Sequence, residues 1–166
     1  MSDSFIPYDE LKKRGYDLST PAGARFAEMC RRVDSLLADI ANQFREVPSP
    51  RITLHVARAY DDEWTVSQER GEELKAKDTE RTWQEVSDSK MECFQEYFTF
   101  SDAEGWRFYL PAFMSHFLRD FPNGGWVAVC TAVRRPDDRL SLLNEGQRRC
   151  VEEFSALCDA YSVWSP

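Results

Sequence analysis

The stretch from Ser101 to Phe121 constrains the fold more than any other part of the sequence. Its apolar residues cover more than one face of a helix, and a helix of that kind is usually buried. Ser101 and Glu104 have the spacing of a capping box, which predicts the start of the helix. Pro111 removes a backbone hydrogen bond, so we expect either a kink or a second helix that begins there. The apolar residues of this predicted central helix are Trp106, Phe108, Tyr109, Leu110, Phe113, Met114, Phe117, Leu118 and Phe121.

Two long helices are predicted before and after the central helix. Thr20 is a suitable N-cap and Pro21 a suitable first helical residue, and apolar residues then recur at helical spacing over residues 21–46. A similar pattern covers residues 141–160. We therefore predict a mainly α-helical, single compact domain of about six helices over residues 20–161, preceded by an N-terminal arm over residues 1–19.

Two further segments have ambiguous patterns. Residues 52–64 show both the alternation of a strand and the spacing of a helix that Thr53 would cap, and we prefer the helix because no partner strand is evident. Residues 126–133 are apolar and valine-rich enough for a short buried strand, but their spacing also fits a helix, which we favour. Between these segments, Trp83 and Val86 are expected to insert into the core from a linker.

The composition argues against several classes of protein. The 166-residue chain has a formal net charge of -8 and would repel a phosphate backbone, so nucleic acid is not an expected partner. No apolar run approaches the roughly 18 residues of a membrane span, and no signal peptide is visible. The five cysteines are odd in number and include no Cys-x-x-Cys pair. We therefore expect a cytoplasmic protein without membrane contact, disulfide scaffold or bound cofactor, and its oligomeric state stays open.

Few residues are candidates for catalysis. The sequence contains no nucleophile-elbow, phosphate-binding or dinucleotide-binding motif. His116 lies in the central apolar stretch, where a structural histidine is more frequent than a catalytic one. His55 precedes Asp61 and Asp62 at a spacing that matches no metal motif, although a histidine near carboxylates can bind a metal or act as a base. A metal-dependent hydrolase that uses His55, Asp61 and Asp62 is therefore an alternative hypothesis, and no residue is assigned as catalytic.

A strongly acidic segment overlaps the end of the predicted helix over residues 52–64. Between Asp61 and Glu80, eight acidic residues stand against three basic ones, and only Val66 and Leu74 are available for burial. The simplest interpretation is a solvent-exposed helix or loop. Two aromatic residues at its beginning also give it the composition of an interface, in which charges steer a basic partner toward aromatic anchors. The predicted partner-binding residues are Tyr60, Asp61, Asp62, Glu63, Trp64, Glu69, Glu72 and Glu73.

Three sequence elements together resemble a known family. They are residues 52–62, the Trp-Gln-x-Val element at residues 83–86, and residues 100–113 with Tyr-Leu-Pro-Ala at positions 109–112. Their order and spacing resemble an uncharacterised family of small bacterial proteins that is known only as a domain of unknown function. The resemblance covers roughly residues 26–158. It implies a compact, mainly helical, bacterial cytosolic domain, and it assigns no catalytic residue.

These observations support three functional hypotheses. The first is a small acidic binding protein, most concretely an immunity protein that neutralises a bacterial toxin by covering a basic surface. The second is the metal-dependent hydrolase described above. The third is a regulatory adaptor that binds a peptide in a groove beside the central helix. We favour the first hypothesis, with a basic toxin domain as the expected protein partner.

Overall fold

The computed structural model describes residues 4–124 and 128–161, which contain nine α-helices, one 3-10 helix and no strand. The mainly helical, single-domain fold is therefore confirmed, whereas the predicted number of about six helices is too low. The additional helices are short, with six residues in α1 and α5 and four in α6. Patterns of that length carry little periodicity. The elements are α1 (Tyr8–Lys13), α2 (Pro21–Gln43), α3 (Leu54–Glu63), α4 (Gln68–Lys75), η1 (Trp83–Glu85), α5 (Asp88–Cys93), α6 (Tyr97–Phe100), α7 (Ala103–Arg119), α8 (Ala128–Arg134) and α9 (Glu145–Tyr161).

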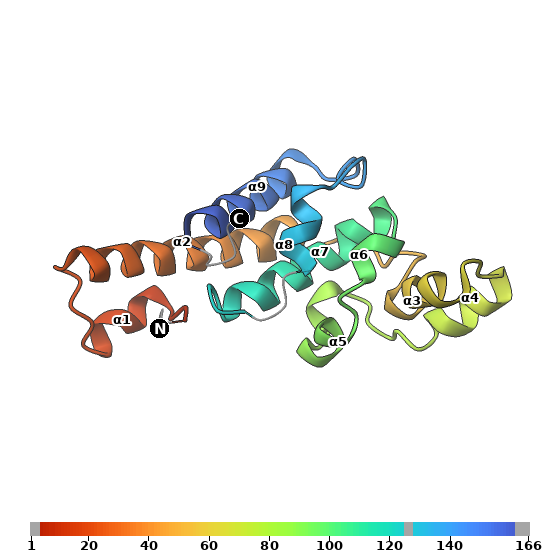
Figure 1. Cartoon of the computed structure of the whole chain (residues 1–166), viewed down its shortest axis with the longest axis horizontal. Helices are drawn as coiled ribbons and strands as arrows, with labels where there is room; N and C mark the ends of the chain where they lie inside the picture. Colours follow the sequence, from red (N-terminus) through yellow and green to blue (C-terminus); the bar gives the residue numbers. More distant parts are fainter. Residues whose placement is uncertain (1–3, 125–127, 162–166) are drawn as a thin grey trace.

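The long helices α2 and α9 pack against each other (Figure 1). As predicted, Thr20 caps α2, and its hydroxyl accepts a hydrogen bond from the Gly23 N–H at 3.1 Å. Helix α9 begins at Glu145 rather than near position 141, because Asn144 and Gln147 form a reciprocal capping box there, at 2.9 and 3.1 Å. The Gln147 amide also donates to the Gln43 carbonyl at 3.0 Å, so one side chain joins the start of α9 to the end of α2.

Helix α7 is the predicted central helix, and twelve of its seventeen residues are buried. It runs through Pro111 as one helix, so the alternative of a second helix that begins at Pro111 is wrong. Asp102, not Ser101, caps it, since the Asp102 carboxylate accepts a hydrogen bond from the Gly105 N–H at 2.9 Å. The predicted capping box is therefore wrong, because the cap lies one residue later and Gly105, at the third helical position, has no side chain to complete a box.

Two buried aromatic side chains donate hydrogen bonds to backbone carbonyls in the connection between α2 and α3. The Tyr97 hydroxyl donates to the Ile52 carbonyl at 2.6 Å, and the Trp83 indole N–H donates to the Phe44 carbonyl at 2.8 Å. Trp83 and Val86 are both buried, as predicted for the linker. These contacts fix the two connections on either side of α3 and α4 to the core, because an unpaired buried carbonyl would be costly.

Two segments complete the arrangement. Residues 128–133 belong to α8, so the strand alternative is wrong there, and positions 126 and 127 lie outside the described residues. In the N-terminal arm, the Phe5 N–H donates to the Phe121 carbonyl at 2.6 Å and the Tyr8 N–H to the Asp34 carboxylate at 2.5 Å.

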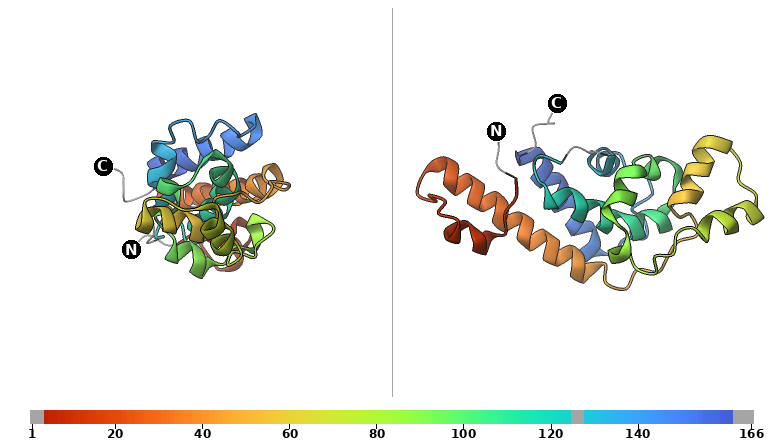
Figure 2. Two further views of the ribbon diagram at one scale, coloured as in Figure 1. Left: turned by 90° about the vertical axis from the view of Figure 1, so that its right-hand side faces the viewer. Right: turned by 90° about the horizontal axis from the view of Figure 1, so that it is seen from below.

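Helices α3 and α4 lie together at one end of the elongated molecule, opposite α1 (Figures 1 and 2). Within the described ranges, none of the helices has the length and apolar character that crossing a membrane requires.

Gly105→Ala tests how tightly the start of α7 packs. A Cβ atom at Gly105 would lie 2.2 Å from the Tyr97 hydroxyl oxygen, and Tyr97 is fully buried. We expect the free energy of unfolding to fall by about 2 kcal/mol in urea denaturation, as for other overpacked cores. Gly71→Ala is the matched control, because its Cβ would meet only a Val66 methyl at 3.9 Å. That variant should gain up to about 1 kcal/mol. Equal stability of the two variants would contradict this account of the packing.

Candidate functional site

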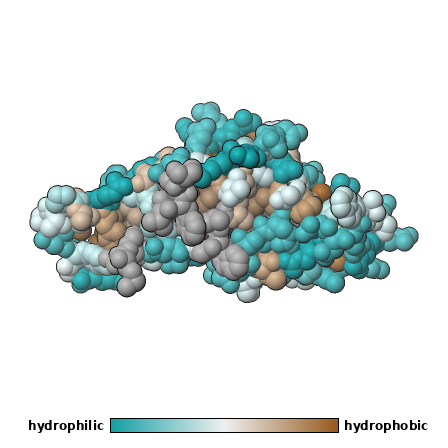
Figure 3. Space-filling view, in the orientation of Figure 1, coloured by the Kyte–Doolittle hydropathy of each residue, from teal (hydrophilic) through white to brown (hydrophobic). Residues whose placement is uncertain are grey.

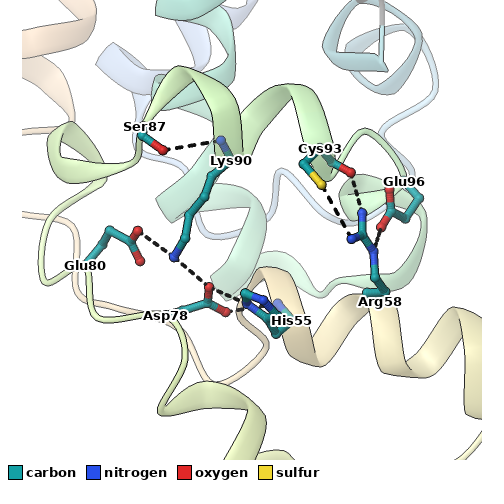
Figure 4. Close-up of polar contacts among 8 residues, drawn as sticks. All are labelled: His55, Arg58, Asp78, Glu80, Ser87, Lys90, Cys93 and Glu96. Carbon is teal, nitrogen blue, oxygen red and sulfur yellow. Dashed lines mark hydrogen bonds and ion pairs between the residues drawn. The ribbon is translucent and has the colours of Figure 1, made fainter.

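Helix α3 is capped from a distant part of the sequence. The Asp78 carboxylate accepts the His55 backbone N–H at 2.9 Å and contacts the His55 ring Nδ1 at 2.8 Å (Figure 4). Thr53, the predicted cap, makes no side-chain capping hydrogen bond. A carboxylate at this position pairs with unsatisfied N–H groups and with the positive end of the helix dipole. Asp78 therefore fixes the start of α3 in place of a local cap.

A lysine from α5 completes this arrangement. The Lys90 ammonium lies 3.0 Å from Asp78 and 2.7 Å from Glu80, and the Asp78 side chain is only 1% exposed. We call His55, Asp78, Glu80 and Lys90 the polar clamp (Figure 4). Burial alone would raise the pKa of Asp78, but hydrogen bonds from His55 and Lys90 outweigh burial and hold this pKa below its ordinary value. The polar clamp thus joins α3, the segment after α4, and α5.

A second set of contacts holds the middle of α3. The Arg58 guanidinium donates to the Glu96 carboxylate at 2.6 Å and to the Cys93 carbonyl. It also lies over the Phe94 ring, 3.8 Å from the ring centroid. Arg58 combines an ion pair and a backbone hydrogen bond (Figure 4) with a cation–π contact, an arrangement that lysine could not reproduce. Helix α3 is therefore held at two points along its length.

The last turn of α3 leads into a strained backbone at Trp64. This residue has φ 60° and ψ -35°, and the Thr65 N–H donates to the Glu63 carbonyl across it at 2.6 Å. Such a γ-turn with positive φ is rare and strained. The Trp64 side chain is nevertheless 88% exposed, so burial does not compensate for the strain. Strain of this kind, of order 1–3 kcal/mol, is typical of functional positions.

The acidic residues before Trp64 lie at the C-terminal end of a helix, where negative charge is unfavourable. Asp61, Asp62 and Glu63 occupy the last turn of α3, which has no basic residue. Carboxylates at the negative end of a helix dipole, and next to each other, are unfavourable. Only Glu63 of the three has an ion-pair partner in the described residues, Arg70 at 3.0 Å. The sequence thus holds an exposed aromatic ring and uncompensated carboxylates together at the end of one helix.

The remaining predicted residues lie on α4. Glu69, Glu72 and Glu73 are all exposed. Arg70 lies 3.8 Å from Glu73 as well as contacting Glu63, so it links α4 to the end of α3. The face drawn in Figure 3 is mainly hydrophilic over these two helices. We call α3, α4 and residues 64–67 between them the α3–α4 tip; it brings together all eight predicted partner-binding residues.

A cleft of about 560 Å³ lies between the two helices of the α3–α4 tip. Its apolar wall includes Val56, Val66 and the half-buried Tyr60, and Gly71 leaves space on the α4 side. Polar side chains, including Glu72, stand among its lining residues. A cleft with an apolar wall and charged residues can accept an apolar side chain from a partner while the surrounding charges stay hydrated.

Two acidic residues of the predicted exposed segment lie elsewhere. Asp78 and Glu80 belong to the polar clamp, with side chains 1% and 10% exposed. Over residues 61–77, six acidic residues therefore face three basic ones, a smaller excess than the sequence suggested. Four of these exposed carboxylates have no ion-pair partner among the residues described: Asp61, Asp62, Glu69 and Glu72.

The geometry does not favour the two alternative functions. The Nδ1 atom of His55 is occupied by Asp78, whereas Asp61 and Asp62 are exposed about 10 Å further along the helix axis. In residues 4–124 and 128–161, no three His, Cys, Asp or Glu side chains lie close enough to hold a metal ion. The apolar residues of α7 from Trp106 to Leu118 are all buried, so their side chains are not exposed to a peptide. His116 has a partner of its own, the Asp88 carboxylate at 3.0 Å.

Asp78→Asn tests the polar clamp through its pH dependence. A carboxylate whose pKa is lowered on folding stabilises the protein above its unfolded pKa of about 3.9, and this contribution is lost as the pH falls. At pH 7 we expect the variant to lose about 3 kcal/mol of unfolding free energy in urea, the lower end of the range for a broken buried pair. The difference from wild type should narrow below about pH 4. The control Asp61→Asn, at an exposed unpaired carboxylate, should stay within about 0.5 kcal/mol. A pH-independent difference at Asp78 would contradict the assignment.

Trp64→Gly tests the backbone strain at the α3–α4 tip. Glycine adopts positive φ freely, so we expect the free energy of unfolding to rise by about 1 kcal/mol relative to Trp64→Ala, which keeps the strain and removes the same ring. Thermal unfolding of both variants measures the difference. Lower stability of Trp64→Gly than of Trp64→Ala would show that the turn is not strained.

The chain was compared with known proteins. Comparisons with curated proteins and with solved structures gave no match. A match to a family described as "Family of unknown function (DUF6714)" extends over residues 32–161, which include the whole α3–α4 tip and the polar clamp. The expected membership of an uncharacterised family is confirmed, and this chain belongs to DUF6714.

Proposed function

We propose that this protein is a binding protein that docks a basic protein partner through the α3–α4 tip, most concretely an immunity protein that neutralises a bacterial toxin. The single observation that carries the proposal is the position of Trp64. Its ring is 88% exposed on a positive-φ turn, next to the carboxylates of Asp61 and Asp62. The exposed ring adds little burial to the fold, and the positive-φ turn and the adjacent carboxylates each lower its stability. Their combination at one position is therefore better explained by binding than by folding.

Each part of the α3–α4 tip has a role in such binding. Exposed tryptophans are the residue type most enriched among binding hot spots, because they bury a large area at low entropic cost. Unpaired carboxylates accelerate the encounter with a basic surface and make it salt-dependent. The ion pairs of Arg58 and of the polar clamp hold α3 before binding occurs. Little conformational entropy is then lost on association.

Neutralisation would follow from occlusion. A toxin that acts on nucleic acid or another anionic substrate needs a basic surface, and an acidic protein seated on that surface excludes the substrate by charge and by volume. The formal net charge of -8 supports long-range attraction to such a partner. The proposal requires no chemistry from the chain itself.

Co-expression with the product of the neighbouring gene tests this function. If that product is toxic, wild-type protein should restore growth, and the purified pair should form a complex in calorimetry. Trp64→Ala should weaken binding about 30-fold, the effect of losing a hot spot worth about 2 kcal/mol. Failure of the wild-type protein to bind or to rescue would refute the immunity function for this pair.

A charge-matched pair of variants tests the surface separately. Asp61→Lys with Asp62→Lys should slow association and flatten its salt dependence. The control is Asp138→Lys with Glu152→Lys, which changes the net charge equally at exposed residues outside the α3–α4 tip. The control should keep most of the affinity. Equal loss in both double variants would mean that net charge, not this surface, attracts the partner.

A further inference from the structure

Two cysteines from different helices meet beside the core. The Sγ atoms of Cys130 in α8 and Cys158 in α9 lie 3.6 Å apart, and both thiols are free. The separation between these atoms is van der Waals contact, roughly 1.5 Å longer than the bond of about 2.05 Å in a disulfide. Rotation of the two side chains, together with a small shift of the seven-residue helix α8, can supply that difference.

The surroundings make the two thiols unequal. Cys130 is partly exposed, whereas Cys158 is buried. The 3.6 Å contact with the Cys158 thiol and the charge of the Arg134 cation together outweigh burial, so the pKa of Cys130 is lowered. The same contact and burial raise the pKa of Cys158. Arg134 also pairs with Asp159 at 3.0 Å, which holds α8 against α9 beside the sulfur atoms.

We infer that Cys130 and Cys158 form a reversible redox-modification site, at which a peroxide or a low-molecular-weight disulfide oxidises the two thiols to one disulfide. Cys130 is the attacking thiolate, because it is accessible and a cation lies near it. Cys158 is the resolving thiol, because it already touches Cys130 and is shielded from solvent. The inference is independent of the proposed binding function, since neither cysteine belongs to the α3–α4 tip.

The reaction with hydrogen peroxide balances in two steps. The Cys130 thiolate attacks one peroxide oxygen, the O–O bond breaks, and the released hydroxide takes up a proton to become water, leaving a sulfenic acid on Cys130. Cys158 loses its proton, and its sulfur attacks the Cys130 sulfur. The S–S bond forms while the S–O bond breaks, and the leaving hydroxide is protonated to a second water. The two thiols together lose two electrons and two protons, and peroxide is reduced to two water molecules.

Intact-mass spectrometry of the folded, reduced protein tests the site. After treatment with a small molar excess of hydrogen peroxide, we expect a loss of about 2 Da, a peptide that links Cys130 to Cys158, and full reversal by dithiothreitol. Oxidation should also raise the thermal midpoint, because the bond connects α8 to α9. Cys93→Ser is the matched control, since it removes an exposed cysteine outside the pair and should keep the 2 Da loss.

The variants and the peptide map distinguish the outcomes. Cys130→Ser and Cys158→Ser should each abolish the 2 Da loss, and circular dichroism checks that both remain folded. If either variant does not fold, the peptide map of the wild-type protein decides alone. Linkage between other cysteines, or oxygen added to Cys130 without a disulfide, would overturn the inference.

Discussion

Burial of α7 is the constraint on which the rest of the fold depends. A helix that is apolar on nearly every side can be stable in water only if other elements cover it from several directions. Helices α2, α5 and α8 and the 3-10 helix η1 all contact α7, although they come from all parts of the chain. Helices as short as α5 and α6 do not form in isolation. Packing against α7 stabilises them, since α5 contacts α7 and Phe98 of α6 packs against the rings of Trp106 and Phe113.

The α3–α4 tip is stabilised in a different way. Its helices lie at the end of the molecule, and charged contacts contribute much of what fixes their position: Asp78 at the start of α3, Lys90 behind it, and the ion pair of Arg58 with Glu96 in the middle. A partly buried ion-pair network is directional, since losing one partner leaves an uncompensated charge. It adds to the apolar packing of α3, in which Leu54, Val56, Ala57 and Ala59 are buried, and fixes the orientation of the helix. Such a fixed orientation would reduce the conformational entropy lost in the proposed binding.

The end of α3 carries two features that lower the stability of the fold. The positive φ of Trp64 and the carboxylates in the last helical turn both cost free energy, and the ion pair of Glu63 with Arg70 offsets only part of this cost. The polar clamp offsets this cost at the other end of the same helix, where Asp78 pairs with the helix dipole in the favourable sense. The stabilising contacts of the polar clamp thus lie at the start of the ten-residue helix α3, and the strained turn lies at its end.

The sequence correctly predicted the features that depend on local motifs or on periodic spacing of apolar residues. The buried helix around Pro111, the cap at Thr20, the insertion of Trp83 and the exposed position of Asp61–Trp64 all follow from spacing and composition, because each reflects neighbours in the chain or a simple division into apolar and polar residues.

Other features required the tertiary structure. Asp78 caps a helix that begins 24 residues before it, and Cys130 meets Cys158 across 28 positions, so no local pattern records either contact. Asp78 was assigned to the exposed acidic surface for the same reason, since its charge alone does not reveal the lysine that pairs with it. Which acidic residues are buried and paired and which are exposed is decided by how the helices pack, because burial and pairing are properties of the folded chain.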